Sequence, residues 1–294
     1  MTAQAIALIL VSALLHAGWN LIGKRTAQTV RFYAFAMGFG MLIFSPLLVR
    51  AWDDVIDMPA AFWLLLILSG LCQTLYMTGL SYAYRAGDLS LVYPLARAIP
   101  VLLVPMLVLL IYGQSALDLQ DVVGMLLIIL GSLALPLNHW RNFQFRNYCT
   151  PAIGWVLMAA SATAGYSLVD SMAIGMMTES GIDAFSAGSS FVVLQAAATL
   201  LWMLPFVRLV MKESLRKIPD IGMTALAGSF IIGTYLLILI SMSMVNEVSY
   251  VVALRQISIP LGVAIGVIWL REPVSTPRLQ GLLLMLTGLV MVSL

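Results

Sequence analysis

Two arginines, Arg97 and Arg255, stand inside long apolar segments of the sequence. Each lies seven or eight residues into its segment, a helical rise of about 11–12 Å that brings it near the middle of a hydrocarbon core about 30 Å thick. A charged side chain there costs at least about 2.5–3.5 kcal/mol and usually marks a substrate path. A guanidinium also offers a planar fork of donors that suits a carboxylate or phosphate. We expect both arginines to contact substrate; the alternative is that they bind backbone carbonyls freed by Pro94, Pro100 or Pro260.

Few other ionisable groups lie within the apolar segments. Asp170 is the only acid well inside one, and it could be a counter-ion for an arginine, a proton-coupling group, or an acid at a helix end that reaches water. His16 and Asn20 lie one helical turn apart on the same face. Histidine titrates near neutrality, so His16 is a second coupling candidate, although an isolated membrane histidine is more often a packing or hydrogen-bonding residue.

A second set of polar and aromatic residues lies within the apolar segments. It consists of Gln73, Tyr76, Tyr93, Gln195, Tyr235, Tyr250 and Gln256. Aromatic residues near segment ends are typical interface anchors, whereas those near the middle could line a pocket. For the substrate site we expect, beside the two arginines, His16, Trp19, Asn20, Gln73, Tyr76, Tyr93, Tyr166, Ser167, Tyr250 and Gln256. Cys72 and Cys149 lie far apart without CxxC spacing, so no disulfide, metal site or cofactor is expected.

Composition identifies the elements that must position these residues. Hydrophobic residues make up 62% of the 294 positions and charged residues 10%, against roughly 45–50% and about 25% in soluble domains. A membrane helix needs about 20 apolar residues. No positive segment or cleavage site accompanies the first apolar run, so we expect it to stay as a helix. The ten expected spans are residues 4–23, 31–49, 61–84, 89–112, 119–137, 152–177, 183–210, 220–245, 248–270 and 276–294.

Positive charge is distributed unevenly between the loops that join these spans. The basic residues at odd-numbered loops are Lys24, Arg25, Arg31, Arg85, Arg141, Arg146, Arg208, Lys212, Arg216, Lys217, Arg271 and Arg278. Only Arg50 lies at an even-numbered loop. Cytoplasmic loops carry the excess of lysine and arginine. The pattern therefore predicts a multi-pass protein of the bacterial inner membrane with both termini outside.

The sequence contains a weak internal repeat. Residues 17–21 match residues 164–168, residues 87–90 match residues 246–249, and the glycine-bounded run 124–131 matches 281–288. We therefore expect two five-helix repeats, 1–137 and 152–294, joined by a linker at 138–151. Because five is odd, consecutive copies must insert in opposite orientations. Such inverted repeats recur in transporters, with the substrate site near the midplane between the halves.

Several of these pieces resemble the EamA-type family of the drug/metabolite transporter superfamily. They are residues 16–20 (HAGWN) with Lys24, residues 87–97 (GDLSLVYPLAR), and the stretch 260–281. The resemblance implies ten helices, alternating access, and export or exchange of amino acids, drugs or other metabolites. It also implies cytoplasmic termini, whereas the charges predict the opposite, and we follow the charges. Gln114 stands where the family often has a glutamate corresponding to Glu272.

The expected function is a secondary transporter of small organic anions or zwitterions, such as amino acids. The alternative is a broad multidrug exporter, suggested by methionine-rich and aromatic helices. The sequence has no Walker A, HExxH or GxSxG motif and no paired carboxylates within a span, so neither ATP-driven transport nor an enzyme is expected. Expected partners are a small-molecule substrate and the lipid bilayer. The glycine pairs at 124/131 and 281/288 could join the two halves or two chains of a homodimer; we favour the former, in a monomer.

Overall fold

The computed structural model describes residues 2–25, 29–87, 89–114, 117–142, 150–216, 220–270 and 275–293. Side chains are described over the same ranges except at 20–25, 89–91, 142 and 265–270. Within these ranges the chain is helical, and no strand occurs. Among the described residues, seven helices are long and apolar enough to cross a membrane. These long apolar helices identify a membrane protein.

The chain before residue 143 forms seven main helical elements. They are α1 (Ala3–Arg25), α2 (Val30–Phe44), the 3-10 helix η1 (Ser45–Ala51), α3 (Trp52–Ile56), α4 (Ala60–Ala86), α5 (Leu89–Tyr112) and α6 (Leu119–Ala134). A short 3-10 turn, η2 (Trp140–Asn142), follows α6. Most of the expected linker, 143–149 with Cys149, lies outside the described residues.

The described chain from residue 150 onward forms a second series of helical elements. Its elements are α7 (Ala152–Glu179), α8 (Ala184–Pro205), the π-helix η4 (Phe206–Val210), α9 (Ile221–Met242), α10 (Val248–Leu254), the 3-10 helix η5 (Arg255–Ile257), α11 (Ser258–Leu270) and α12 (Thr276–Ser293). Seven of the expected spans coincide with helices long and apolar enough to cross a membrane. The expected spans at 4–23, 119–137 and 248–270 coincide with shorter apolar helices, Ala3–Trp19, Leu119–Ala134 and Val248–Ala264.

Prolines coincide with the irregular parts of these helices. Pro46 lies in η1, Pro205 immediately precedes the π-helix, and η5 interrupts the segment before Pro260. A proline removes one backbone donor and clashes with the carbonyl four residues earlier. The stretch 248–270, expected as one span, is therefore divided into α10, η5 and α11. By contrast, α5 remains helical across all three of its prolines.

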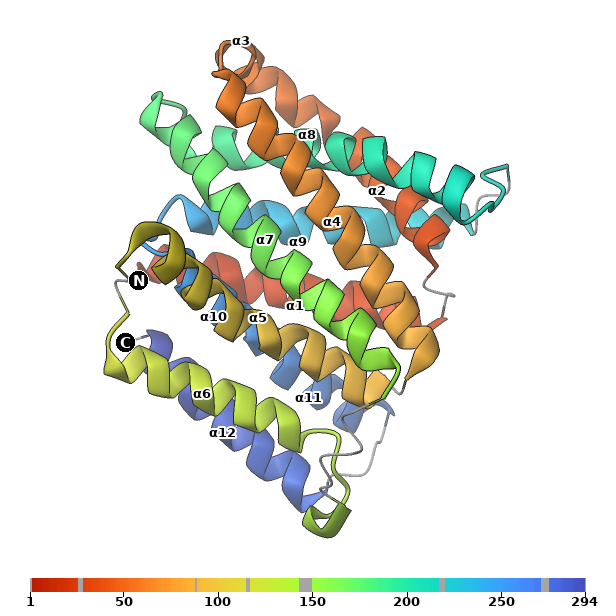
Figure 1. The fold of residues 1–294 in the computed structure, drawn as a ribbon, viewed down its shortest axis with the longest axis vertical. Helices are drawn as coiled ribbons and strands as arrows, with labels where there is room; N and C mark the ends of the chain where they lie inside the picture. Colours follow the sequence, from red (N-terminus) through yellow and green to blue (C-terminus); the bar gives the residue numbers. More distant parts are fainter. Residues whose placement is uncertain are drawn as a thin grey trace.

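Helices from the first half of the chain pack against helices from the second half. α4 packs along α7 and α1 along α9, while α2 contacts α9 and α4 contacts α8. In Figure 1, α6 and α12 lie side by side at one end of the molecule, away from α8 and α3. The core thus lies between segments that are far apart in sequence.

The contact between α6 and α12 is built on four glycines. A Cβ added to Gly124 would lie 2.8 Å from the carbonyl oxygen of Gly288, and one added to Gly131 would lie 2.4 Å from that of Gly281. Such distances are shorter than any real Cβ contact, so only glycine fits here. We call these four residues the glycine seam. The expectation that they join two parts of one chain is confirmed.

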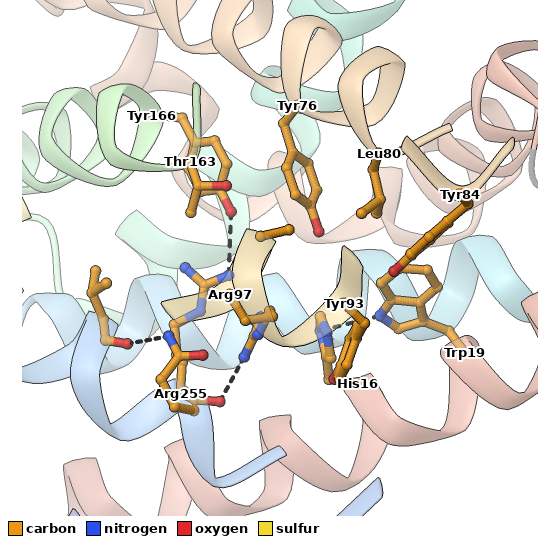
Figure 2. Close-up of a pocket in the computed structure, with 13 residues that line it drawn as sticks. His16, Trp19, Tyr76, Leu80, Tyr84, Tyr93, Arg97, Thr163, Tyr166 and Arg255 are labelled. Atoms are coloured by element: carbon orange, nitrogen blue, oxygen red, sulfur yellow. Dashed lines mark hydrogen bonds between the residues drawn. The ribbon is translucent and has the colours of Figure 1, made fainter. Parts of the chain in front are cut away.

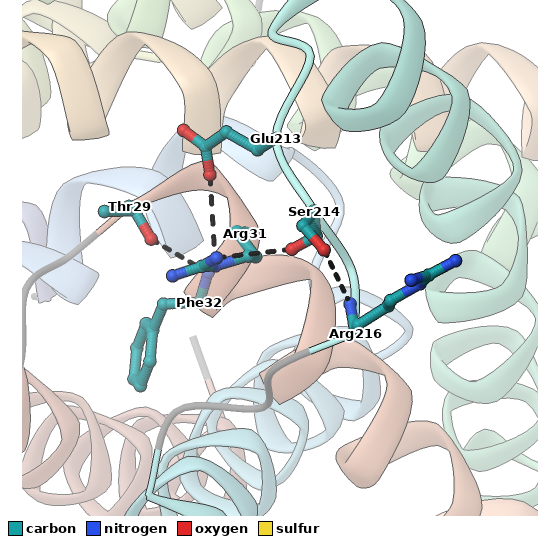
Figure 3. A network of polar contacts seen from close by, with 6 residues as sticks. All are labelled: Thr29, Arg31, Phe32, Glu213, Ser214 and Arg216. Carbon is teal, nitrogen blue, oxygen red and sulfur yellow. Dashed lines mark hydrogen bonds and ion pairs between the residues drawn. The ribbon is translucent and has the colours of Figure 1, made fainter.

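The loops between helices meet at two opposite ends of the molecule. At one end, Arg31 at the start of α2 donates from Nη1 to the carbonyl of Ser214 (3.2 Å) and lies 3.9 Å from Glu213 (Figure 3). At the same end of the molecule, Arg278 Nε at the start of α12 donates to the carbonyl of Leu135 at the end of α6 (3.4 Å). These contacts connect the segments that follow α1, α6, α8 and α11.

Contacts at the opposite end connect the remaining loops. Gln120 Nε2 donates to the carbonyl of Met291 (3.0 Å), and the Tyr250 hydroxyl donates to Asp121 (2.8 Å). The starts of α6 and α10 therefore lie beside the end of α12. In Figure 1 the two chain termini also lie on one side of the molecule.

Candidate functional site

One pocket lies where α1, α4, α5, α7 and the broken segment α10–η5 meet (Figure 2). It contains both buried arginines and several aromatic rings. We call it the arginine pocket, and its lining residues are His16, Trp19, Tyr76, Leu80, Tyr84, Tyr93, Ala96, Arg97, Thr163, Tyr166, Val252, Arg255 and Gln256.

Arg97 enters the pocket from α5 and is 9% exposed. Its Nη2 donates to the backbone carbonyl of Arg255 (2.6 Å) and to Ser258 Oγ (2.8 Å). This nitrogen therefore binds a backbone carbonyl of η5, but that carbonyl also accepts from the backbone N–H and hydroxyl of Ser258 and is not one freed by a proline, as the alternative expected. Arg97 Nε, however, has no hydrogen-bond partner among the described residues. The side chain is anchored at one nitrogen and still offers a donor.

Arg255 lies on η5 and is 8% exposed. Its Nη2 donates to the hydroxyl of Tyr166 at 3.3 Å, and its guanidinium carbon lies 5.9 Å and 5.7 Å from the ring centres of Tyr166 and Tyr235. This cation–π contact stabilises the charge without neutralising it. Nη1 has no hydrogen-bond partner in the part of the chain described. Nor does any described carboxylate lie within 4.0 Å of Arg97 or Arg255.

Aromatic rings form the remaining wall. Tyr76 packs edge-on against Tyr166 with ring centres 5.8 Å apart, and Tyr166 packs likewise against Tyr235 at 5.5 Å. Across the pocket, Trp19 Nε1 donates to His16 Nδ1 at 3.2 Å. A neutral His16 that accepts at Nδ1 carries its proton on Nε2. The pocket thus combines apolar faces with polar tips that mostly donate.

The side chains nearly fill the pocket, leaving room for no more than about one water molecule. Sites for small organic ligands usually enclose about 300–1,000 Å³. The pocket is therefore smaller than a site for a metabolite-sized ligand. A ligand of metabolite size requires the surrounding helices to separate.

Asp170 lies outside the lining and is fully buried on α7. Its Oδ2 accepts hydrogen bonds from Gln195 Nε2 (2.7 Å) and from the hydroxyl of Tyr235, and Gln195 also donates to Ser69 (2.8 Å). Its Oδ1 has no hydrogen-bond partner among the described residues. Since Arg255 stacks on Tyr235, this ring connects the carboxyl group to the pocket. The Asp170 network is the second buried polar feature of the core.

The structure brings most of the expected site residues together. Those that line the pocket are His16, Trp19, Tyr76, Tyr93, Arg97, Tyr166, Arg255 and Gln256. Gln73 and Ser167 are buried in α4 and α7 but do not line it. Tyr250 lies away from it, at the start of α10, where its hydroxyl reaches Asp121. The side chain of Asn20 lies outside the described residues, as do Lys24 and Glu272.

Five lining residues were missed in the sequence: Leu80, Tyr84, Ala96, Thr163 and Val252. The sequence contained two signals that could have identified some of them. Tyr76, Leu80 and Tyr84 recur at four-residue spacing and so share one helix face. The match of residues 17–21 with 164–168 also pairs His16 with Thr163.

Comparison with known proteins adds information about the fold alone. No protein-family model matches the chain, and no curated protein matches it. A solved crystal structure, described only as that of a protein, superposes with a TM-score of 0.72 at 16% sequence identity. The match covers 100% of this chain and 99% of the other. At this identity the likeness establishes a shared fold.

Proposed function

We propose that this chain is a secondary transporter of small organic metabolites that carry a carboxylate or similar anionic group. The observation that carries the proposal is the arginine pocket, where two buried guanidinium groups keep unpartnered donors and no described carboxylate lies within 4.0 Å of either. Retaining two cations in an apolar core is costly. A ligand anion that completes their hydrogen bonds offsets this cost.

We further propose ten spans arranged as two inverted repeats, as in the EamA-type family. The packing supports this because exchanging the halves exchanges the contacts. α4–α7 becomes α9–α1, α2–α9 becomes α8–α4, and α6–α12 is unchanged. The glycine seam has the same property, since Gly124–Gly288 becomes Gly281–Gly131. The seam is used within one chain, which supports a monomer.

The two ends of the molecule support the proposed threading. The odd-numbered loops, which hold most of the basic residues, meet through Arg31 and Arg278, and the opposite loops meet through Gln120 and Tyr250. We propose that the basic end faces the cytoplasm of a bacterial cell and that both termini lie outside. Reporters that are active on only one side of the membrane, fused after Leu294, test this orientation. A cytoplasmic carboxyl end contradicts it.

Alternating access follows from where the pocket lies. Arg97 belongs to the first half and Arg255 to the second, and the bond from Arg97 to the Arg255 carbonyl crosses between them at η5. Movement of the halves opens the pocket, and an anion between the two guanidinium groups draws them together again. We propose Asp170 as the coupling group, because a buried carboxyl beside the pocket can gain or lose a proton as access alternates.

Single replacement of each arginine tests the proposal. Purified Arg97→Ala and Arg255→Ala proteins, reconstituted in vesicles, should lose at least about tenfold of carboxylate uptake, because a hydrogen bond to a charged group contributes about 1.5–3 kcal/mol. Arg208→Ala, at an exposed position on η4, is the matched control and should retain uptake. Thermal unfolding of each variant separates lost transport from lost folding. Normal uptake by both pocket variants, or transport restricted to cationic drugs, would contradict the proposal.

A further inference from the structure

The polar groups of the arginine pocket are unevenly divided between donors and acceptors. Arg97 Nε and Arg255 Nη1 are unpartnered donors among the described residues. A neutral His16 contributes an N–H at Nε2, because Nδ1 accepts from Trp19. Two lining residues carry a side-chain acceptor without a partner in the described part of the chain, the amide oxygen of Gln256 and the hydroxyl oxygen of Tyr84, and both groups are neutral.

An ammonium group would find no charged partner in this pocket. No aspartate or glutamate is among the lining residues that the structure describes. The buried carboxyl of Asp170 lies outside the lining, and its Oδ2 already accepts from Gln195 and Tyr235. Two guanidinium groups would in addition repel a third positive charge.

The apolar part of the wall selects the body of the ligand. Tyr76 and Tyr166 present ring faces and edges on one side, and Trp19 lies on the other (Figure 2). Such surfaces favour a flat or aromatic ligand, since ring pairs prefer edge-on and offset contacts. The rings and the guanidinium groups lie in the same pocket, so one ligand can satisfy both.

From this arrangement we infer that the pocket accepts aromatic or similarly apolar carboxylates without an ammonium group and discriminates against the corresponding amino acids. The inference rests on the proposed function and narrows its substrate class from carboxylate-bearing metabolites in general. It follows from the absence of a charged acceptor among the lining residues described. A site discriminates against a ligand when it leaves one of the ligand's polar or charged groups without a partner.

Three matched ligands test the inference on the full-length purified protein. They are 3-phenylpropanoate, L-phenylalanine, which adds an ammonium group, and 2-phenylethylamine, which lacks the carboxylate. Binding is measured by calorimetry and by thermal shift. We expect 3-phenylpropanoate to bind at least about tenfold more tightly than phenylalanine, because an unpaired buried charge costs this much or more, and 2-phenylethylamine not to bind. Equal or tighter binding of phenylalanine would overturn the inference and leave the proposed function intact.

A variant that adds a charged acceptor to the lining tests the inference independently. Gln256→Glu adds a carboxylate to the lining with little change in shape, and should lower the preference for 3-phenylpropanoate over phenylalanine by about tenfold. Gln120→Glu, exposed at the start of α6 and outside the lining, is the control and should leave the ratio unchanged. An unchanged ratio in Gln256→Glu would overturn the inference. The inference would also be overturned if the unmodified protein bound neither 3-phenylpropanoate nor phenylalanine. That result alone would leave the proposed function standing, because rejecting it requires unimpaired carboxylate uptake by the arginine variants.

Discussion

The glycine seam and the arginine pocket join the same two halves of the chain in opposite ways. At the seam, backbone meets backbone, and the distances leave no space for a methyl group at Gly131 or Gly288. In the pocket, the halves meet through Arg97 and the carbonyl of Arg255, with donors left over. Close-packed contacts resist displacement, whereas polar contacts can exchange partners. Under the proposed function, the seam would hold the halves together while the pocket changes shape between them.

The largest effect is expected from filling the seam. A Cβ at position 288 would lie 2.3 Å from the carbonyl oxygen of Gly124, so Gly288→Ala forces the helices apart at a cost of about 1–3 kcal/mol or more. Gly154→Ala is the matched control, because a Cβ there meets nothing within 4 Å; it should raise stability by about 0.5–1 kcal/mol. Thermal unfolding in detergent measures both. Equal behaviour of the two variants would mean that the seam is not close-packed.

A smaller and more specific effect is expected beside the pocket. Asp170→Asn keeps an acceptor for Gln195 and Tyr235 but removes the ionisable group. If Asp170 carries the coupling proton, vesicles with this variant lose accumulation driven by a pH gradient and keep substrate exchange. The loss is at most about tenfold for one coupled proton at a gradient of one pH unit. The other groups that face Asp170 are Ser69 and the cation Arg255.

Tyr235→Phe is the control for this experiment. It removes the hydroxyl that donates to Asp170 but keeps the ring under Arg255 and the carboxyl group itself. Gradient-driven accumulation should therefore persist in this variant. Accumulation that survives in Asp170→Asn would exclude Asp170 as the coupling group and leave the binding role of the arginine pocket untouched.

The contrast between seam and pocket also explains what could be predicted from sequence. The seam was predictable because a fixed seven-residue spacing of glycines recurs in both halves. Arg97 and Arg255 could be placed in one pocket because buried cations are rare and the repeat relates their helices. The glycine spacing and the two arginines could both be recognised from local patterns and from the internal repeat of the sequence.

Features that depend on how helices face one another could not be predicted. Tyr250 precedes Arg255 by five residues, about 7.5 Å along a helix and on a different face, and so it contacts Asp121 rather than the pocket. The 3-10 turn at η5 requires both Pro260 and a partner for the carbonyl of Arg255. Ser258 is a local partner through its backbone N–H and hydroxyl, but the additional bond from Arg97 comes from another helix, and no local pattern specifies it.

The smallest effect is expected at a third contact between the halves, the ion pair of Arg31 and Glu213 (Figure 3). The two groups are 3.9 Å apart and about 30% exposed, so solvent screens them, and such pairs contribute about 0–1 kcal/mol. Glu213→Gln should therefore shift unfolding only slightly, and less still in high salt. The bond from Arg31 to the carbonyl of Ser214 remains in this variant. A loss as large as that of Gly288→Ala would mean that this end of the molecule, and not only the seam, holds the halves together.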